Sequence, residues 1–207
     1  MAPLPKEVDR RWVFRGTLGP SGAPAYNPGT NTEEPMSGLK PNTKVPDLEV
    51  ETAGGEIWRL ADQKPETFAL IEFYRGYHCP RCRQHLIDLQ AKLDRFAERG
   101  VQVIAISTDG VDRAEKAKEN WGLDRLTIGY GLSLEKAREW GLYLSNAITD
   151  VEPRQFNEPA MCLVRPDGTL YSAIYNSTPF NRPHFADVLE SIDMIRSRDY
   201  PPRGDAD

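Results

Sequence analysis

The chain has 207 residues, of which 39% are hydrophobic and 28% charged, a balance that predicts one globular domain with a substantial core. Its net charge of −5 gives no reason to expect nucleic-acid binding. No apolar run reaches the roughly 20 residues of a membrane-spanning helix, and the first residues lack the apolar core of a secretory signal. Three cysteines make no disulfide framework, so we expect a reducing compartment, the cytoplasm.

The N-terminal residues 1–43 are rich in proline. Seven of the 17 prolines fall here. Because proline fixes φ and removes an amide donor, no long helix or central strand is expected in this part of the chain. We predict an irregular extension; the alternative is an arm that wraps a second subunit and docks through Trp12, Val13 and Phe14.

From Lys44 onward the pattern predicts alternating strands and helices that form a mixed sheet with helices on both faces. The domain is expected over 44–198, followed by a flexible polar tail at 199–207. In chain order we predict strands at 45–50 and 56–60 as a hairpin, a buried strand at 67–73, a helix from about Cys79 to Ala97, a strand at 101–107, a helix at 112–121, a short strand at 126–129, a helix at 133–140, an irregular segment at 143–158, a hairpin at 161–175 and a closing helix at 183–198.

Two thiols stand where the buried strand at 67–73 gives way to a helix. In the sequence Cys79-Pro80-Arg81-Cys82, the first sulfur is expected beside the unpaired amides of the first helical turn, which favour the thiolate. Pro80 fits the first helical position, where its missing donor is not needed. Cys82, one turn further on, is placed to attack an oxidised Cys79 and close a short disulfide. This pattern indicates redox chemistry.

The residues around the thiols are cationic. No acidic residue stands between Glu72 and Asp88, and the cations or titratable bases near the pair are Arg75, His78, Arg81 and Arg83. They favour a lowered pKa at Cys79. His78 either tunes Cys79, shuttles a proton, or is simply solvated.

The remaining histidines and the third cysteine need no role in redox chemistry, and metal or haem binding competes with redox chemistry as the use of the cysteine pair. His85 and His184 are given no role, and Cys162 is interpreted as a buried, inert thiol. Zinc or an iron–sulfur cluster would need two more ligands than the pair supplies, and haem attachment would need a histidine where Arg83 stands. We therefore predict no metal and no cofactor, and leave open a structural pair of buried thiols.

Together these residues resemble the thioredoxin superfamily and, within it, the redoxin or AhpC/TSA (peroxiredoxin-like) family. The resemblance covers about 44–198. It rests on Val45-Pro46-Asp47-Leu48, on Phe73-Tyr74-Arg75-Gly76 leading to the two thiols, on Pro159 before a strand, and on Arg165-Pro166-Asp167-Gly168. It implies an α/β thioredoxin-like fold with an N-terminal β-hairpin extension, a cis proline at Pro159, an attacking thiol at Cys79 and a resolving thiol at Cys82.

The chain departs from both patterns that it resembles. Peroxiredoxins carry Thr or Ser three residues before the attacking cysteine and Arg near the start of the late strand; here these positions are Gly76 and Pro159, and Arg75 or Arg154 is left as a substitute. Thioredoxins carry Trp before the first cysteine and Gly-Pro within the pair, where this chain has His78 and Pro80-Arg81. The departures favour thioredoxin-type dithiol chemistry over peroxide reduction.

The predicted function is that of a thiol–disulfide oxidoreductase using Cys79 and Cys82, with thiol-dependent peroxide reduction as a second reaction open to the same pair. The implied partners are a disulfide protein or small thiol reductant and a hydroperoxide, with no nucleic acid and no membrane; a homodimer is left open. The alternatives are a binding or scaffold module with a redoxin fold, and a metal chaperone that uses the cysteine pair.

Overall fold

The computed structural model describes residues 38–206, all of which belong to one compact unit, Pro35–Asp207. Most of the predicted extension at 1–43, including Trp12, Val13 and Phe14, lies outside the described residues. The helices are α1 (Pro80–Gln90), α2 (Leu93–Ala97), α3 (Val111–Asn120), α4 (Leu134–Glu139) and α5 (Phe185–Arg198), with a 3-10 turn at Leu60–Asp62. The strands are β1 (Glu49–Thr52), β2 (Ile57–Arg59), β3 (Phe68–Phe73), β4 (Val101–Ile106), β5 (Ile128–Tyr130), β6 (Leu144–Asn146), β7 (Gln155–Asn157), β8 (Ala160–Val164) and β9 (Leu170–Tyr175).

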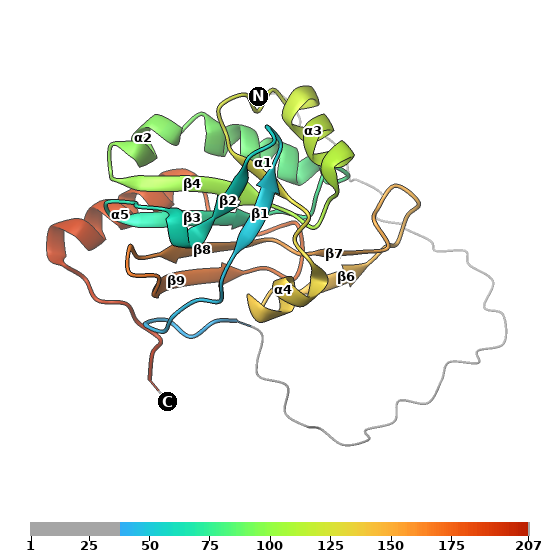
Figure 1. Cartoon of the computed structure of the whole chain (residues 1–207). Coiled ribbons are helices and arrows are strands. Elements are labelled where there is room, and N and C mark those ends of the chain that lie inside the picture. The colour runs from blue at the N-terminus through green and yellow to red at the C-terminus, as the bar shows by residue number, and fades with distance from the viewer. Residues whose placement is uncertain (1–37, 207) are drawn as a thin grey trace, which may run out of the picture. The chain divides into compact units, whose positions relative to one another are not determined.

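Seven strands form one mixed sheet in the order β2-β1-β5-β4-β3-β8-β9 (Figure 1). The pairs β3–β4 and β4–β5 are parallel, and the pairs with β1, β8 and β9 are antiparallel. The remaining strands, β6 and β7, make a separate two-stranded sheet. The predicted fold class, a mixed central sheet flanked by helices, is confirmed.

The two faces of the sheet carry separate apolar cores because side chains alternate along each strand. Leu70 of β3 packs in the core covered by α1, α3 and α5, whereas Ile71 packs in the core covered by α4. Figure 1 shows α1 and α3 on one side of the sheet and α4 on the other. By the same alternation, Glu72 lies on the face of Leu70 and so faces α1.

The parallel strands β3, β4 and β5 end at the same edge of the sheet. The loop that follows β3 begins at Tyr74, whose N–H donates to the carbonyl of Ile106 at the end of β4. The loop after β4 carries Ser107, Thr108 and Asp109. Two segments more than 30 residues apart in sequence are thus brought side by side beneath the start of α1.

Two predicted elements were wrong in detail. The helix expected from about Cys79 to Ala97 is two helices, since the end of α1 tightens where the N–H of Lys92 donates to the carbonyl of Leu89, and Lys92 itself leaves the helical region. The segment 143–158, expected to be irregular, contains β6 and β7, which pair from Leu144↔Asn157 to Asn146↔Gln155. These three-residue strands are too short and polar for alternation to reveal them.

Residues on both sides of the predicted domain pack against β9. The N–H of Leu39 donates to the Tyr175 hydroxyl, and the N–H of Asn42 donates to the carbonyl of Leu170. In the segment expected to be a flexible tail, the carbonyl of Tyr200 accepts from the Tyr171 hydroxyl at 2.8 Å. The boundaries 1–43, 44–198 and 199–207 stay predictions. Within 38–206, no helix is long and apolar enough to cross a membrane.

Candidate active site

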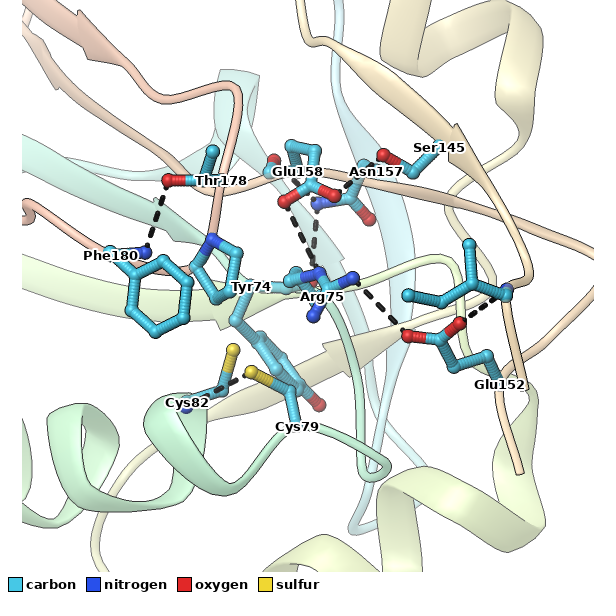
Figure 2. Close-up of polar contacts among 12 residues, drawn as sticks. Tyr74, Arg75, Cys79, Cys82, Ser145, Glu152, Asn157, Glu158, Thr178 and Phe180 are labelled. Carbon is cyan, nitrogen blue, oxygen red and sulfur yellow. Dashed lines mark hydrogen bonds and ion pairs between the residues drawn. The ribbon is translucent and has the colours of Figure 1, made fainter. Parts of the chain in front are cut away.

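The two thiols lie at the first turn of α1, as the spacing predicts (Figure 2). Cys79 is the N-cap residue, with extended backbone, and Pro80 occupies the first helical position. The Cys82 N–H donates to Cys79 Sγ at 3.2 Å, so the sulfur takes the place of a capping oxygen. The first intrahelical bond runs from the N–H of Arg83 to the carbonyl of Cys79. Helix formation itself therefore directs an amide at this sulfur.

The loop before the thiols is held from below by Asp109. Asp109 Oδ2 accepts from the Tyr77 N–H at 2.6 Å. A side chain on Gly76 would collide with this carboxylate, because its Cβ would lie 2.6 Å from Oδ2, and Gly76 has a φ of +125°. Burial raises the pKa of Asp109, while the bond from Tyr77 opposes the rise. A Thr or Ser at position 76 would have to displace the Asp109 carboxylate from its bond with Tyr77.

Cys79 carries the more acidic thiol of the pair. A hydrogen bond with the Cys82 side chain contributes most to lowering its pKa to about 6, against the opposing effect of burial; the Cys82 N–H, Arg182 and Arg75 add to the lowering. A thiol with a pKa near 6 is mostly thiolate at neutral pH, which is the nucleophilic form.

Both thiols are buried, with exposed fractions of 1% for Cys79 and 0% for Cys82, but only Cys79 lines the depression described below. Burial, together with the hydrogen bond and charge of Cys79, raises the pKa of Cys82 well above its ordinary value, and Arg182 opposes the rise. The pair is therefore polarised: one thiol is ionised and the other keeps its proton. This is the division of roles expected of an attacking and a resolving cysteine.

Arg75 is held between two carboxylates (Figure 2). Its Nη2 lies 3.3 Å from Glu152 Oε1, its Nε lies 3.2 Å from Glu158 Oε2, and its guanidinium stacks over Phe156. Glu152 comes from the β6–β7 connection, and Ser145 of β6 donates to Glu158. The small second sheet, which sequence reasoning missed, thus fixes the cation beside Cys79.

The other cations predicted near the thiols contribute less to lowering the pKa of Cys79 than their sequence positions indicate. Burial, and the positive charge of Arg75, lower the pKa of His78 to about 4, so this side chain is neutral above that pH; it packs against Phe156. Arg81 is exposed and lies over the Phe180 ring, and Arg83 is exposed on α1. The cations that lower the pKa of Cys79 are Arg182 and Arg75.

The expectation of a cis proline at Pro159 is wrong. None of the peptide bonds among residues 38–206 is cis. The trans form is the intrinsically preferred one. With this bond trans, the backbone groups on both sides of it have hydrogen-bond partners: the N–H of Glu158 donates to the carbonyl of Tyr143, and the carbonyl of Pro159 accepts from the N–H of Asn176. Pro159 is buried and directly precedes β8; it follows the Glu158 that holds Arg75.

A depression of about 560 Å³ opens beside Cys79. It brings together four of the predicted site residues, Arg75, Cys79, Pro80 and Arg81, and adds Pro179 and Phe180 from the β9–α5 connection. Cys82 lies behind this surface. Arg154, offered as a substitute cation, is exposed on the β6–β7 connection. Within 38–206, no cluster of three or more His, Cys, Asp or Glu side chains is arranged to hold a metal ion.

Two important residues were not found from the sequence. Arg182 lies 100 residues from Cys82 along the chain, yet its Nη2 is 3.6 Å from Cys82 Sγ, and no motif marks it. Asp109 could have been found, because it follows β4, whose carboxyl end had to meet that of β3. Cys162 is buried in β8; burial raises its pKa to about 12, which agrees with an inert thiol.

Comparison with solved structures identifies the class of fold as thioredoxin-like, of the kind found in peroxiredoxins. Peroxidoxin BcpB from Mycobacterium tuberculosis superposes with a TM-score of 0.63 at 21% identity, over 76% of this chain and 99% of that one. A Cys-to-Ser mutant of peroxiredoxin 6 from Arenicola marina gives a TM-score of 0.68 at 19% identity, over 78% and 76%. At these identities the likeness establishes the fold.

The family follows from the sequence. Residues 41–173 match the model of the AhpC/TSA family, and the chain belongs to that family. It is 34% identical over 77 residues to 1-Cys peroxiredoxin B of Oryza sativa subsp. indica, and 31% identical over 85 residues to peroxiredoxin Bcp of Bacillus subtilis. These matches cover 37% and 41% of the chain, and 34% and 54% of the relatives' own lengths.

Proposed function

We propose that the chain is a thiol-dependent peroxidase that works through the dithiol of Cys79 and Cys82. The observation that carries this proposal is the polarised pair at the start of α1, in which the Cys82 N–H donates to Cys79 Sγ and the pKa of Cys79 is lowered to about 6. A peroxidase needs a thiolate at neutral pH, beside an open depression that a peroxide can enter. Membership of the AhpC/TSA family supports peroxide over disulfide as the oxidant.

The cycle has three balanced steps. The Cys79 thiolate attacks the terminal oxygen of a hydroperoxide; an S–O bond forms, the O–O bond breaks, the alkoxide leaves and takes a proton from solvent, and Cys79 becomes a sulfenic acid. Cys82 then attacks that sulfur, the S–S bond forms, and water leaves. Two equivalents of an external thiol reduce the disulfide and are themselves oxidised to a disulfide.

Arg75, His78, Pro80, Arg81 and Pro159 have supporting roles in this proposal. Arg75 supplies positive charge near Cys79, and its two carboxylates keep it in place. Pro80 starts the helix that directs the amide at the sulfur. His78 packs against Phe156 as a neutral side chain and is only a weak base, since its pKa is about 4. Arg81 borders the entrance, and Pro159 follows the Glu158 that holds Arg75.

The test is anaerobic stopped-flow oxidation of the reduced protein by hydrogen peroxide, followed by mass spectrometry. We expect fast formation of a Cys79–Cys82 disulfide, no oxidation in Cys79→Ser, and a sulfenic acid that dimedone traps in Cys82→Ser. Cys162→Ser is the matched control, because this buried thiol lies in β8, in the core on the opposite face of the sheet, and should leave the rate unchanged.

Two other outcomes separate the remaining functions. Slow, non-saturable oxidation by peroxide together with fast reduction of a disulfide substrate would favour thiol–disulfide exchange. A Cys79 that alkylates no faster than a free thiol would leave a binding or scaffold module. We further propose a small thiol or a dithiol protein as reductant, a reducing compartment such as the cytoplasm as the setting, and a homodimer as a state to be tested by sedimentation.

A further inference from the structure

Arg182 enters the thiol site from the connection between β9 and α5. Asn181 adopts a left-handed backbone, with φ of 57°, and the chain then directs the next side chain inward. Arg182 Nε and Nη2 both donate to the carbonyl of Pro179, at 3.3 and 3.2 Å. The side chain is only 6% exposed. The guanidinium is therefore pinned by its own loop and buried beside the sulfurs.

The partners of Arg182 leave part of its hydrogen-bonding capacity free. Its Nη2 contacts Cys82 Sγ at 3.6 Å, and its Nη1 lies 3.9 Å from Glu72 Oε1. Glu72 is also 3.2 Å from His85 Nε2 and is almost fully buried. Nη1 has no hydrogen-bond acceptor among the described residues. A buried guanidinium with one loosely placed carboxylate keeps most of its positive potential for the neighbouring sulfur.

Cys82 is the thiol that needs such a cation. In the proposed cycle it acts as a thiolate twice: when it attacks the sulfenic acid of Cys79, and when it leaves as an external thiol reduces the disulfide. Its burial opposes both events, because ionisation in an apolar setting is unfavourable. The titratable side chains that face it are Cys79 from the same helix, Tyr74 from the loop after β3, and Arg182.

We propose that Arg182 is a further catalytic residue of this site, whose guanidinium stabilises the Cys82 thiolate during disulfide formation and again during disulfide reduction. This role rests on the proposed dithiol cycle. Both arginines lower the pKa of Cys79, but they differ at Cys82. Arg75 is paired with Glu152 and Glu158 and borders the depression beside Cys79, whereas the guanidinium of Arg182 contacts the Cys82 sulfur.

The first experiment measures the ionisation of Cys82 directly, by thiolate absorbance near 240 nm in a Cys79→Ser background. All variants also carry Cys162→Ser, so that Cys82 is the only thiol that titrates, because the pKa values of Cys82 and Cys162 are both raised. We expect Arg182→Gln to raise the pKa of Cys82 by roughly one unit or more, the effect of losing an adjacent opposite charge. In Arg182→Lys the pKa of Cys82 should lie between the values with Arg182 and with Gln at this position, since lysine keeps the charge but not the planar guanidinium.

The second experiment follows disulfide formation with both thiols present. After one equivalent of hydrogen peroxide, Arg182→Gln should accumulate the dimedone-reactive Cys79 sulfenic acid, with resolution slowed roughly tenfold at neutral pH, matching a one-unit pKa change. The defect should shrink as pH rises. Arg198→Gln, at the exposed end of α5, is the matched control.

Removing Arg182 alone leaves Glu72 buried without its cation, so Arg182→Gln could fail to fold. The double variant Arg182→Gln/Glu72→Gln removes both charges at similar volume and should show the same slow resolution. An unchanged Cys82 pKa and unchanged resolution in folded variants would overturn the role of Arg182. If wild-type Cys79 does not react with peroxide, the peroxidase proposal fails, whereas the absorbance titration still decides whether Arg182 stabilises the Cys82 thiolate.

Discussion

The reactivity of Cys79 depends on groups within a few ångströms of its sulfur. The Cys82 side chain and N–H stabilise the thiolate, and two arginines add to this against the effect of burial. Most of these contacts are local to one helical turn, so a Cys-Pro-x-Cys sequence is enough to predict them. The arginine at position 182 is the exception, because a contact across 100 residues leaves no pattern in the sequence.

The pH dependence of alkylation follows from these shifts. The pKa of Cys79 is about 6, and the thiolate is the reactive form, so the iodoacetamide rate should rise as pH increases through 6 and level off by about pH 8. Below pH 6 it should fall about tenfold per pH unit. Cys82 and Cys162 stay protonated over this range, because burial raises their pKa values. An inflection near the ~8.5 of a free cysteine would contradict the assignment.

Gly76 stands where peroxiredoxins carry Thr or Ser, and the structure explains this difference. Gly76→Thr would recreate the peroxiredoxin residue, but its Cβ would lie 2.6 Å from Asp109 Oδ2 at a φ of +125°. Backbone strain and the loss of the Tyr77–Asp109 bond should together destabilise the protein by about 2–4 kcal/mol and slow peroxide reduction. Urea unfolding and the stopped-flow assay measure the two effects.

A matched control separates the collision from the backbone strain. Gly55 also has a positive φ, of +84°, but nothing lies within 4 Å of the position of its Cβ. Gly55→Thr should therefore lose only about 1–2 kcal/mol, from backbone conformation alone. Equal losses at positions 55 and 76 would mean that Asp109 moves aside freely, and that the space below the loop does not exclude a side chain.

At the scale of elements, α1 both positions the thiols and is capped by one of them. Because Cys79 Sγ accepts from the Cys82 N–H at 3.2 Å, chemistry and capping can be separated by mutation. Cys79→Ser keeps an acceptor and Cys79→Ala removes it. Both should be inactive, but the alanine variant should be less stable than the serine variant by about 1 kcal/mol.

Thermal or urea unfolding of the two variants gives this difference. Ser133→Ala is the control, since Ser133 Oγ accepts from the Lys136 N–H at the start of α4, far from the thiols. Its loss of stability measures how much an ordinary N-cap hydrogen bond contributes in this protein. Equal stability of the two Cys79 variants would show that the sulfur contact does not hold the helix start.

The elements that position the thiols differ in how well the sequence predicts them. β3 and β4 are apolar runs of strand length, and α5 has a clear helical period, so each was found. The β6–β7 pair was not, because its strands are three residues long and its main anchor is the single buried Phe156. Without that pair, the two carboxylates that hold Arg75 could not be inferred.

At the scale of the whole molecule, the alternation of strands and helices predicts the sheet, and the resemblance predicts the thioredoxin-like order. The boundary at residue 44 was harder to place. Residues 39–43 have no strand pattern, yet their backbone bonds to β9 through Asn42, Thr43 and Leu170. Backbone contacts do not depend on side-chain type, which is why residue patterns did not reveal them.

Two truncations test where the domain begins. A chain that starts at Gly38 retains the bonds of Leu39, Asn42 and Thr43 to β9 and is the reference for the shorter chain. A chain that starts at Lys44 loses these bonds. At about 1 kcal/mol of net stability for each of two or three bonds, its melting temperature should fall by roughly 4–10 °C. Equal melting temperatures for the two truncated chains would restore the boundary to 44, and sedimentation of the Gly38 chain against the full chain would show whether residues 1–37 act as an arm that joins two subunits.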